Sequence, residues 1–396
     1  MNFIKIRAVD FCKSITDGTH DSPKRTKTGK PLVTSKHLSR YGIDFDSTYL
    51  ISESDYKKVI ARSRVDKWDV LYSMIGTIGN IYIETSNNTE YACKNVGIFK
   101  MGGAEYKSKW LYYYLQTRAA QEYILGVSRG TTQGYVPLGA LRELQIPITD
   151  SYTMNRITSV LWEIDEKIKN NRAINHNLLQ QVLALYRQMF VDSPNDNRKI
   201  CRADEYFDIS IGKTPPRKEP EWFKTVRTDN IVWVSIADMG NCGLFIDDSS
   251  EYLSPDAVKK FNVVTVPNDT VLLSFKLTVG RIAITDGQMT TNEAIAHFKT
   301  DNKAINEYLY CYLKSYNFQT LGSTSSIATA VNSKIIKAMP FVVPTDEEIS
   351  TFHDFAAPIF NKIKACQHEN ARLVELRDSL LPKLMSGEID VSEVEL

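Results

Sequence analysis

Basic and hydroxyl-bearing side chains gather in two pairs of loops, and each half of the chain holds one loop of each pair. The first pair is DGTHDSPKRTKTGK from Asp17 and GKTPPRK from Gly212. The second pair is SRGTTQGY from Ser128 and GSTSSIAT from Gly322. Arginine and lysine neutralise phosphates, while threonine, histidine, asparagine and glutamine reach base edges. These loops therefore suit duplex DNA, although a solvated loop rich in glycine and proline would have a similar composition.

The candidate DNA contacts are the charged and hydrogen-bonding side chains in and beside these loops. In the first half they are Thr19, His20, Lys24, Arg25, Lys27, Lys36, His37, Arg129, Thr131, Thr132, Gln133 and Tyr135. In the second half they are Lys213, Arg217, Lys218, Lys276, Arg281, Ser323, Thr324 and Ser325. The second pair of loops differs in composition between the halves. Two modules that read different base sequences would differ in this way, and so would loops that drifted without selection.

The sequence contains no set of residues that indicates catalysis. The tetrad IGKT at Ile211 lacks the glycine that a phosphate-binding loop needs five positions before Gly212, where Phe207 stands. No GxGxxG fingerprint opens a βαβ unit, no HExxH motif occurs, and the one Pro-Pro pair lies outside the tetrad typical of amino-methyltransferases. The six histidines are scattered, so each is better explained as a surface or core residue than as a general base. We expect no catalytic residue and no cofactor in this chain.

Composition and charge restrict the class of protein further. The six cysteines form no CxxC pair and have no ordered spacing with histidine, which argues against a zinc site and a disulfide framework. This usage indicates a reducing compartment and predicts a cytoplasmic protein without a metal site. The formal net charge is +1, so any binding to nucleic acid must depend on local basic clusters. No window reaches the roughly 18 apolar residues that a membrane span needs.

The sequence segments that are expected to position the loops occur twice in the chain. WDVLYSMIGTIGNIYI from Trp68 returns as NDTVLLSFKLTVGRIAI from Asn268. The matched residues are Ser73, Thr77, Gly79 and Ile81 in the first copy and Ser274, Thr278, Gly280 and Ile282 in the second. Further on, WLYYYL from Trp110 matches YLYCYL from Tyr308. A spacing of about 200 residues is far longer than that of a solenoid repeat, so each copy is expected to be a domain with its own core.

A long helical run follows each copy. Residues 151–190 contain neither proline nor glycine. Apolar residues recur there at steps of three or four, at Ile157, Val160, Ile164, Ile168, Leu178, Val182, Leu185 and Met189. The later run, about 347–385, has a similar seam at Phe352, Phe355, Ile359, Ile363, Cys366, Leu373, Leu380 and Leu384. Such spacing is typical of coiled-coil helices.

Polar residues and a proline interrupt these seams. Asn171 and Asn175 break the first seam, and Asn370 breaks the second, as polar residues do where register matters more than stability. Pro358 is expected to bend or interrupt the first turns of the second helix. Matched length, position and midpoint polarity favour an antiparallel pair, with a domain at each end. The alternative is two unrelated amphipathic helices packed on separate domains.

The sequence therefore predicts an α+β fold with two repeated mixed domains and two long antiparallel helices. The expected segments are a first domain (1–150), a first helix (151–192), a second domain (193–345) and a second helix with the C-terminal tail (346–396). Expected strands lie at 31–35, 70–73, 79–83, 231–236 and 271–275, and expected domain helices lie at 108–125 and 304–316. The segment VDSPNDN from Val191 is predicted to close the first long helix.

Together these features resemble the specificity subunit of a type I restriction-modification system. The likeness rests on the duplicated domain, the two helices, the GTTQ sequence in the loop from Ser128, and LLPKLMSGEI from Leu380, and it covers essentially the whole chain. The resemblance implies that each domain is a target-recognition domain reading one half of a split double-stranded DNA target, with the helices setting the unread gap. In the second copy SSIA from Ser325 replaces GTTQ, so this loop need not do the same work in both halves.

The resemblance also implies partners that carry the chemistry. These are two modification subunits that use S-adenosylmethionine, and restriction subunits that use ATP and Mg²⁺. The apolar side chains of Leu380, Leu381, Leu384 and Met385 exceed what one seam needs, so we expect them to bind a modification subunit. Three alternatives remain open: a scaffold that holds two domains for ligands other than DNA, a subunit of a type IIG-like methyltransferase system, and a free-standing enzyme.

Overall fold

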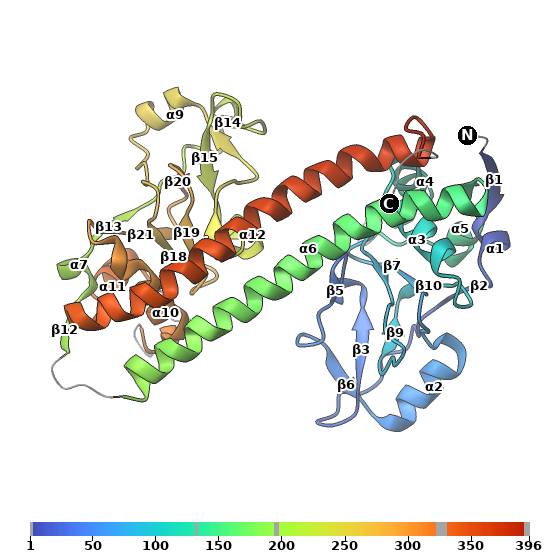
Figure 1. Ribbon diagram of the computed structural model, residues 1–396, viewed down its shortest axis with the longest axis horizontal. Coiled ribbons are helices and arrows are strands. Elements are labelled where there is room, and N and C mark those ends of the chain that lie inside the picture. Colours follow the sequence, from blue (N-terminus) through green and yellow to red (C-terminus); the bar gives the residue numbers. More distant parts are fainter. Residues whose placement is uncertain (1–2, 131–133, 194–197, 322–330, 392–396) are drawn as a thin grey trace. The chain divides into compact units, whose positions relative to one another are not determined.

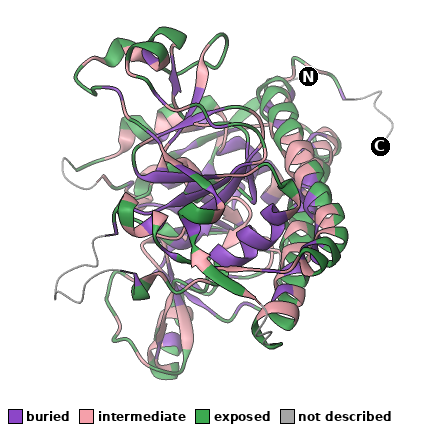
Figure 2. Cartoon of the chain, turned by 90° about the vertical axis from the view of Figure 1, so that its left-hand side faces the viewer, coloured by how far each residue is buried: buried purple, intermediate pink, exposed green. Residues whose placement is uncertain are grey.

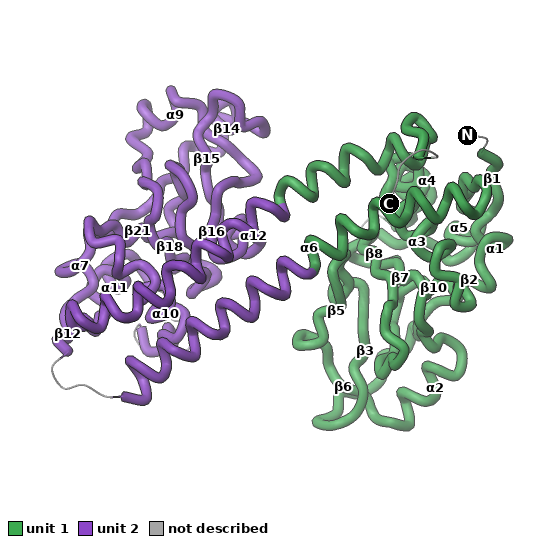
Figure 3. Tube along the Cα trace, in the orientation of Figure 1, with its two compact units in different colours: residues 1–169, 371–396 green, residues 170–370 purple. Residues whose placement is uncertain are grey.

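The two copies in the sequence fold as two units with matching orders of strands and helices (Figures 1 and 3). This computed structural model describes residues 3–130, 134–193, 198–321 and 331–391. Unit 1 comprises residues 1–169 and 371–396, and unit 2 comprises residues 170–370. The chain passes from one unit to the other within its two longest helices, α6 (Ser151–Tyr186) and α12 (Asp346–Ser386).

Unit 1 contains a main antiparallel sheet in the order β2-β10-β7-β8 and a smaller sheet in the order β6-β3-β9. Its strands are β1 (Ile4–Arg7), β2 (Ser14–Asp17), β3 (Lys30–Thr34), β4 (Leu38–Ser39), β5 (Gly42–Ile43), β6 (Tyr49–Ile51), β7 (Val70–Ser73), β8 (Ile81–Ile83), β9 (Ala92–Lys94), β10 (Val96–Lys100) and β11 (Gln145–Ile148). Its helices are α1 (Ala8–Phe11), α2 (Glu53–Ser63), α3 (Glu105–Tyr114), α4 (Arg118–Val127) and α5 (Leu138–Glu143), with a 3₁₀ turn η1 (Ser35–His37). In a third, two-stranded sheet, β1 pairs with β11.

Unit 2 repeats this plan, with one strand added to its main sheet and one to its smaller sheet. The orders are β13-β21-β18-β19-β16 in the main sheet, β14-β17-β15-β20 in the smaller sheet, and β12-β22 in the pair. The strands are β12 (Lys199–Arg202), β13 (Asp208–Ile211), β14 (Phe223–Lys224), β15 (Ile231–Val234), β16 (Phe245–Ile246), β17 (Tyr252–Leu253), β18 (Val271–Ser274), β19 (Ile282–Thr285), β20 (Thr290–Thr291), β21 (Ile295–Lys299) and β22 (Pro340–Val343). The helices are α7 (Ala203–Tyr206), α8 (Ile236–Asn241), α9 (Pro255–Lys260), α10 (Asn306–Ser315) and α11 (Ser333–Lys337), with 3₁₀ turns η3 (Pro220–Trp222), η4 (Lys303–Ile305) and η5 (Phe318–Thr320). The parallel pairing of β15 with β20 repeats that of β3 with β9.

The central strands are apolar on both faces because both faces are covered. Helix α3 packs against β7 and β8, and α10 packs in the same way against β18 and β19. In β7, Val70 and Tyr72 join the core beneath α3, while Leu71 joins a second cluster with Val33 on the opposite face. Figure 2 shows the strands of the sheets largely buried, and exposed residues along much of the long helices. The continuous apolar runs of these strands are thus explained by layers on both sides.

Most expected elements are found, with one division that the sequence analysis missed. The expected strand at 70–73 is β7, and the expected helix at 304–316 corresponds to η4 and α10. The single helix expected at 108–125 is wrong, because α3 ends at Tyr114 and α4 begins at Arg118. Thr117 caps α4, since its side-chain oxygen accepts from the Ala120 amide at 3.4 Å. Threonine at this position stabilises a new helix start.

The long helices pair antiparallel within each unit. In unit 2, Asn171 donates to the side-chain oxygen of Asn370 at 3.0 Å, and Asn175 donates to the Ile363 carbonyl at 3.3 Å. In unit 1, Arg377 Nη1 lies 2.8 Å from Asp165 Oδ1. Partners later in α6 lie earlier in α12, which confirms the expected direction. Asn171 and Asn370, which interrupt the two predicted seams, thus bind each other.

Two details of the predicted seams are wrong. Helix α12 runs without interruption through Pro358 and also continues past Pro382 to Ser386. Each proline is exposed, as are Asp354 and Asp378 four residues earlier, so water can bind the carbonyls that lose their helical donor. Phe355 is 44% exposed and lies off the buried stripe. The first helical run extends to its expected end, but its last turn, η2 (Arg187–Val191), is π-helical and follows α6 directly.

Candidate nucleic-acid interface

Strand register brings several loops to one edge of the main sheet in unit 1. In β10, Gly97 pairs with Asp17 at the end of β2, and Val96 pairs with Ser73 at the end of β7. The segment after β2 and the hairpin between β7 and β8 therefore leave the sheet side by side. We call residues 18–20, 74–80, 95, 128–130 and 134–136 the loop edge of unit 1. In unit 2, Ile211 and Ser274 pair in the same way with Ala296 and Ile295 of β21, and Ile282 begins β19 on the other side of β18.

Both loop edges begin with a glycine that cannot be replaced without a shift of the backbone. Gly18 donates to the Val96 carbonyl at 2.9 Å, and Gly212 donates to the Ile295 carbonyl at 3.1 Å. A Cβ atom on Gly18 would lie 2.2 Å from the Cys93 carbonyl oxygen, and one on Gly212 would lie 2.1 Å from the carbonyl oxygen of Asn292. The two basic loops that the sequence analysis paired therefore start from equivalent places.

The two hairpins at these edges are held by the same hydrogen bonds. Ser73 Oγ accepts from the Asn80 amide at 2.7 Å, and Ser274 Oγ accepts from the Arg281 amide at 3.0 Å. Gly79 and its counterpart Gly280 have left-handed φ angles of 98° and 93°. The matched serine and glycine in the sequence therefore mark a conserved turn geometry within the chain. Residues 275–281, with the loop that begins at Gly212, form the loop edge of unit 2.

A third loop joins the hairpin in unit 1. Ile75 and Tyr135 are paired as an isolated antiparallel bridge, and the Val136 amide donates to the Met74 carbonyl at 2.9 Å. Arg129 and Tyr135 exchange backbone hydrogen bonds of 2.9 and 2.8 Å, so both lie beside the hairpin and both are exposed. Three candidates of this loop lie outside the described residues: Thr131, Thr132 and Gln133. The same holds for the unit 2 candidates Ser323, Thr324 and Ser325.

Other unit 1 candidates are divided between the loop edge and the smaller sheet. Thr19 bridges to Lys94, and exposed His20 lies between Asp17 and Asn95, at 2.9 Å from a side-chain oxygen of each. Farther along, the Arg25 guanidinium lies 4.9 Å from the centroid of the Tyr49 ring in β6. Three further cations, all exposed, are Lys24, Lys27 and Lys36. The basic loop from Asp17 therefore follows the smaller sheet and is not confined to the loop edge.

His37 is buried and cannot contact DNA as expected. Its Nδ1 accepts from the Thr34 amide at 2.9 Å, and burial lowers the pKa of the imidazole. A neutral histidine that accepts from its own backbone turn is a structural residue. Its neighbour Lys36 stays exposed, so only the charge of this turn remains available.

Two arginine candidates in unit 2 are occupied by structural contacts. Arg281 is half-buried and donates to the Ile236 carbonyl at 2.5 Å, which ties the hairpin to α8. Arg217 makes two hydrogen bonds of 2.8 Å to Glu251 and lies 4.0 Å from the centroid of the Phe223 ring. The Glu251 hydrogen bond is the main reason that its pKa is raised. These two guanidinium groups hold the fold, whereas three lysines of unit 2 are exposed: Lys213, Lys218 and Lys276.

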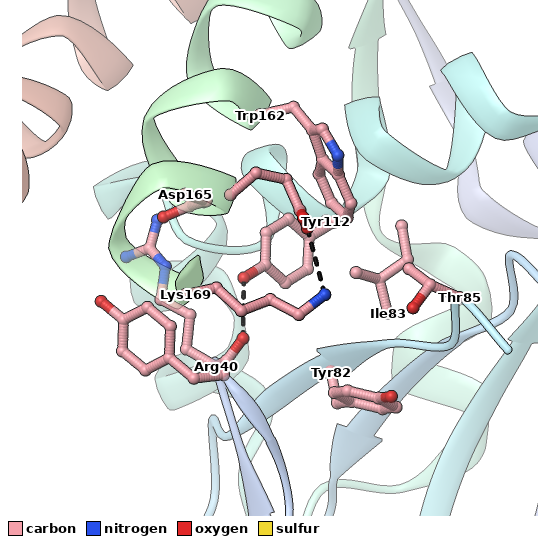
Figure 4. A pocket seen from close by; sticks show the side chains of 10 residues that line it. Arg40, Tyr82, Ile83, Thr85, Tyr112, Trp162, Asp165 and Lys169 are labelled. Carbon is pink, nitrogen blue, oxygen red and sulfur yellow. Dashed lines mark hydrogen bonds and ion pairs between the residues drawn. The ribbon is translucent and has the colours of Figure 1, made fainter. Parts of the chain in front are cut away.

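Beside the long helices, unit 1 has a small cavity of about 60 Å³ that sequence reasoning did not find (Figure 4). Asp165 accepts from Arg377 at 2.8 Å and from the Tyr113 hydroxyl at 2.9 Å, and Arg40 approaches it to 3.5 Å. Burial alone would lower the pKa of Arg377, but hydrogen bonds with Tyr41 and Asp165 raise it instead. This paired network anchors Arg40 and Tyr113 of unit 1 to both long helices. Its residues are far apart in the sequence, so no local pattern could have indicated it.

The residues expected to bind a partner are part of the unit 1 core. Leu381, Leu384 and Met385 are buried with Trp110 and Leu161, and Leu380 packs partly buried against the same cluster. The expectation of a free apolar surface at these four residues is therefore wrong. The C-terminal segment instead completes the domain that begins at the other end of the chain.

The described part of the chain offers neither a metal site nor a membrane-spanning helix. Within residues 3–130, 134–193, 198–321 and 331–391, no three His, Cys, Asp or Glu side chains lie together as a metal site would require. All six cysteines fall in these ranges and are free thiols. Over the same ranges, no helix is both long and apolar enough to span a membrane.

Comparison with known proteins identifies the repeated unit. The family described as "Type I restriction modification DNA specificity domain" matches residues 5–180 and again residues 195–374. The HindI type I restriction enzyme specificity subunit of Haemophilus influenzae is 22% identical, over 83% of this chain and 88% of that protein. The MjaIX specificity subunit of Methanocaldococcus jannaschii is 25% identical, over 92% of this chain and 88% of that protein.

A solved structure shows the same fold. The S subunit of a type I restriction-modification system from M. genitalium gives a TM-score of 0.55 with 15% sequence identity, over 97% of this chain and 96% of that one. The family match falls once on each copy of the repeat, and together the two matches cover most of the residues. The chain therefore belongs to the type I restriction modification DNA specificity domain family.

Proposed function

We propose that this chain is the specificity subunit of a type I restriction-modification complex, and that each loop edge reads one half of a split DNA target. One observation carries this proposal. The two edges share the hydrogen bonds of their hairpins but carry different side chains, for example Ile75 in one hairpin and exposed Lys276 in the other. Two domains that share a backbone structure but expose different side chains are suited to reading two different base sequences.

The distribution of charge supports DNA as the ligand. The formal net charge is only +1, yet exposed lysines stand in or beside the loops of both units. Exposed cations bind phosphates and place the loops, while hydroxyl and amide groups select bases. Arg281 is left out of this role because its guanidinium is bound inside the unit, and Arg217 is left out because Glu251 already pairs with it. The contact set proposed for unit 2 is therefore smaller than the sequence analysis expected.

The catalytic work belongs to partner proteins. The chain shows no catalytic motif in its sequence, so we propose that it is not itself an enzyme. Two modification subunits with S-adenosylmethionine would methylate the DNA, and restriction subunits with ATP and Mg²⁺ would translocate and cut it, in the cytoplasm. Exposed apolar side chains on the long helices, such as Tyr152 and Leu376, are better docking residues than the buried leucines near the C-terminus.

The direct test is the methylated motif of cells that carry this chain with its modification subunit. We expect a split motif with two half-sites. Exchange of residues 196–345 for those of another family member should change one half-site and leave the other intact. The reciprocal exchange of residues 1–150 is the matched control and should change the opposite half. A change in both halves, or in neither, from a single exchange would contradict modular reading.

A second test addresses the helices as a ruler. Asn171 binds Asn370 across the helix pair, so an insertion in one helix alone would break this register. Four residues inserted after Asn171 and four before Asn370 would add about one turn to each helix, or roughly 6 Å, and would keep these two asparagines facing each other. B-DNA rises about 3.4 Å per base pair, so the unread gap should grow by one or two base pairs. An unchanged gap in an active variant would mean that the helices do not measure DNA.

A further inference from the structure

The hairpin tips of the two units share a backbone conformation but differ in one residue. Gly76 in unit 1 has a φ angle of 75°, and Leu277 at the equivalent position of unit 2 has a φ angle of 59°. Glycine adopts this left-handed conformation freely. A leucine side chain is strained there by about 1–2 kcal/mol, because its Cβ crowds the following carbonyl. Unit 2 therefore carries a strained residue where unit 1 has the residue that avoids strain.

The side chain of Leu277 is also almost completely in water. It is 99% exposed, the most exposed of the large hydrophobic residues in the described ranges. A leucine that is buried instead of exposed stabilises a protein by about 1.5–3 kcal/mol, and Leu277 gains none of this in the free chain. Strain and exposure together make leucine a poor choice for the stability of this turn. We therefore expect a binding partner to cover the side chain of Leu277.

The surroundings of Leu277 indicate DNA as the covering partner. Lys276 precedes it and is exposed, and Ile211, which leads into the Lys213 loop, joins the same strand edge. The carboxylate of Glu293 is close enough to Lys276 for their charges to interact, and it accepts a hydrogen bond from Thr214. Exposed lysines beside an apolar tip suit a phosphate-lined groove better than the apolar interior of a protein interface.

We propose that Leu277 is a specificity-determining residue that contacts the 5-methyl group of a thymine in the half-site read by unit 2. In the major groove, the thymine methyl is the apolar group that base edges present to a protein. A hairpin tip that projects one leucine beside cations can reach such a group. Gly76 has no side chain, so the tip of unit 1 cannot make this contact. The inference rests on the proposed function and extends it to one residue and one base feature.

Deoxyuridine provides the test, because it differs from thymidine only by the missing methyl. The assembled complex of this chain with its modification subunits is titrated with its own target duplex, in which each thymine of the second half-site is replaced in turn. We expect one replacement to weaken binding by about fourfold, the factor for one buried methyl-sized group. Leu277→Gly should weaken binding to the thymine target and lose the difference between thymine and deoxyuridine at that position.

Two controls separate this contact from other roles of the hairpin. Lys276→Ala should lower the salt dependence of binding but keep the thymine preference. Leu277→Gly should leave the response to deoxyuridine in the first half-site unchanged. A half-site without thymine, no sensitive position, or equal sensitivity in Leu277→Gly would overturn the inference while the split motif still supports the proposed function. Failure of Leu277→Gly to capture modification subunits would assign the residue to a protein contact instead and would also overturn it.

Discussion

Between the long helices, unit 1 holds an ion pair at positions where unit 2 holds apolar side chains. When Lys167 is aligned with Lys362 in the repeat, Asp165 corresponds to Phe360, and Val182 corresponds to Arg377. Asp165 and Arg377 are bonded at 2.8 Å, whereas Phe360 and Val182 are both buried in the core of unit 2. The same backbone structure therefore accommodates an ion pair in one unit and apolar side chains in the other, provided that every buried polar atom has a partner.

The central strand shows the same freedom. Ile98 in β10 and His297 in β21 occupy matching positions, and both are fully buried. His297 Nε2 lies 2.7 Å from Thr291 Oγ1, and its Nδ1 lies 3.0 Å from Ser210 Oγ. Unit 2 thus has a hydrogen-bonded imidazole where unit 1 has an aliphatic side chain. The difference makes unit 2 alone sensitive to pH at this position.

The helix comparison predicts the largest effect. Arg377→Ala should destabilise unit 1 by about 3–5 kcal/mol, because the carboxylate of Asp165 would remain buried with less compensation. Val182→Ala in unit 2 should cost only about 1–2 kcal/mol, the loss of two methyl-sized groups. Urea unfolding, with hydrogen exchange to assign the change to a unit, measures both. Exposed Lys362→Ala is the control. An Arg377→Ala protein as stable as the parent would show that the ion pair does not anchor unit 1.

The loops predict an asymmetry in phosphate contacts. Replacement of Lys24, Arg25 and Lys36 by alanine should lower the slope of log affinity against log salt by up to about three units, or roughly two to three orders of magnitude in affinity near 0.1 M salt. Arg217→Ala should barely change the slope, because Glu251 already holds this guanidinium. Binding titrations at several salt concentrations measure the slope for each variant. Equal slopes for the triple variant and the parent would remove these cations from the interface.

The buried imidazole predicts a pH dependence confined to unit 2. Burial lowers the pKa of His297 to about 3, against about 6.5 in an unfolded chain. The unfolded state therefore binds more protons between these values, so stability is full above about pH 6.5 and falls as the pH drops. At pH 5 the loss is about 2 kcal/mol. His297→Ile, which copies Ile98, should flatten this part of the stability profile. Urea unfolding from pH 7.5 to 4.5 tests it, and an unchanged slope in the variant would contradict the assignment.

The hairpin tips predict the smallest effect. Leu277→Gly should stabilise unit 2 by up to about 1 kcal/mol, since it relieves about 1–2 kcal/mol of left-handed strain but adds about 0.5–1 kcal/mol of unfolded-chain entropy. Gly76→Leu should destabilise unit 1 for the converse reason. Thermal unfolding of both variants checks the signs. Destabilisation by Leu277→Gly would show that the leucine already has a packing role in the free chain.

Much of the architecture could be predicted from the sequence because its signals are local. The recurrence of Ser73 and Gly79 marked two equal hairpins, and regular apolar spacing marked two long helices. The polar breaks at Asn171 and Asn370 predict register residues, and a hydrogen bond joins these two side chains. Each signal depends on neighbours within a few turns or on direct repetition, so the printed order of residues contains it.

Only the tertiary structure decided which side chains are available for function. His37 and Arg281 have the composition of DNA-binding residues, yet each is engaged by backbone from its own unit. Leu384 resembles a docking residue until Trp110, far away in the sequence, is seen in the same core. The strain at Leu277 is likewise invisible in the residue order, because a φ angle follows from the hairpin that closes around it. Burial and hydrogen-bond partners depend on distant segments, and residue types alone do not specify them.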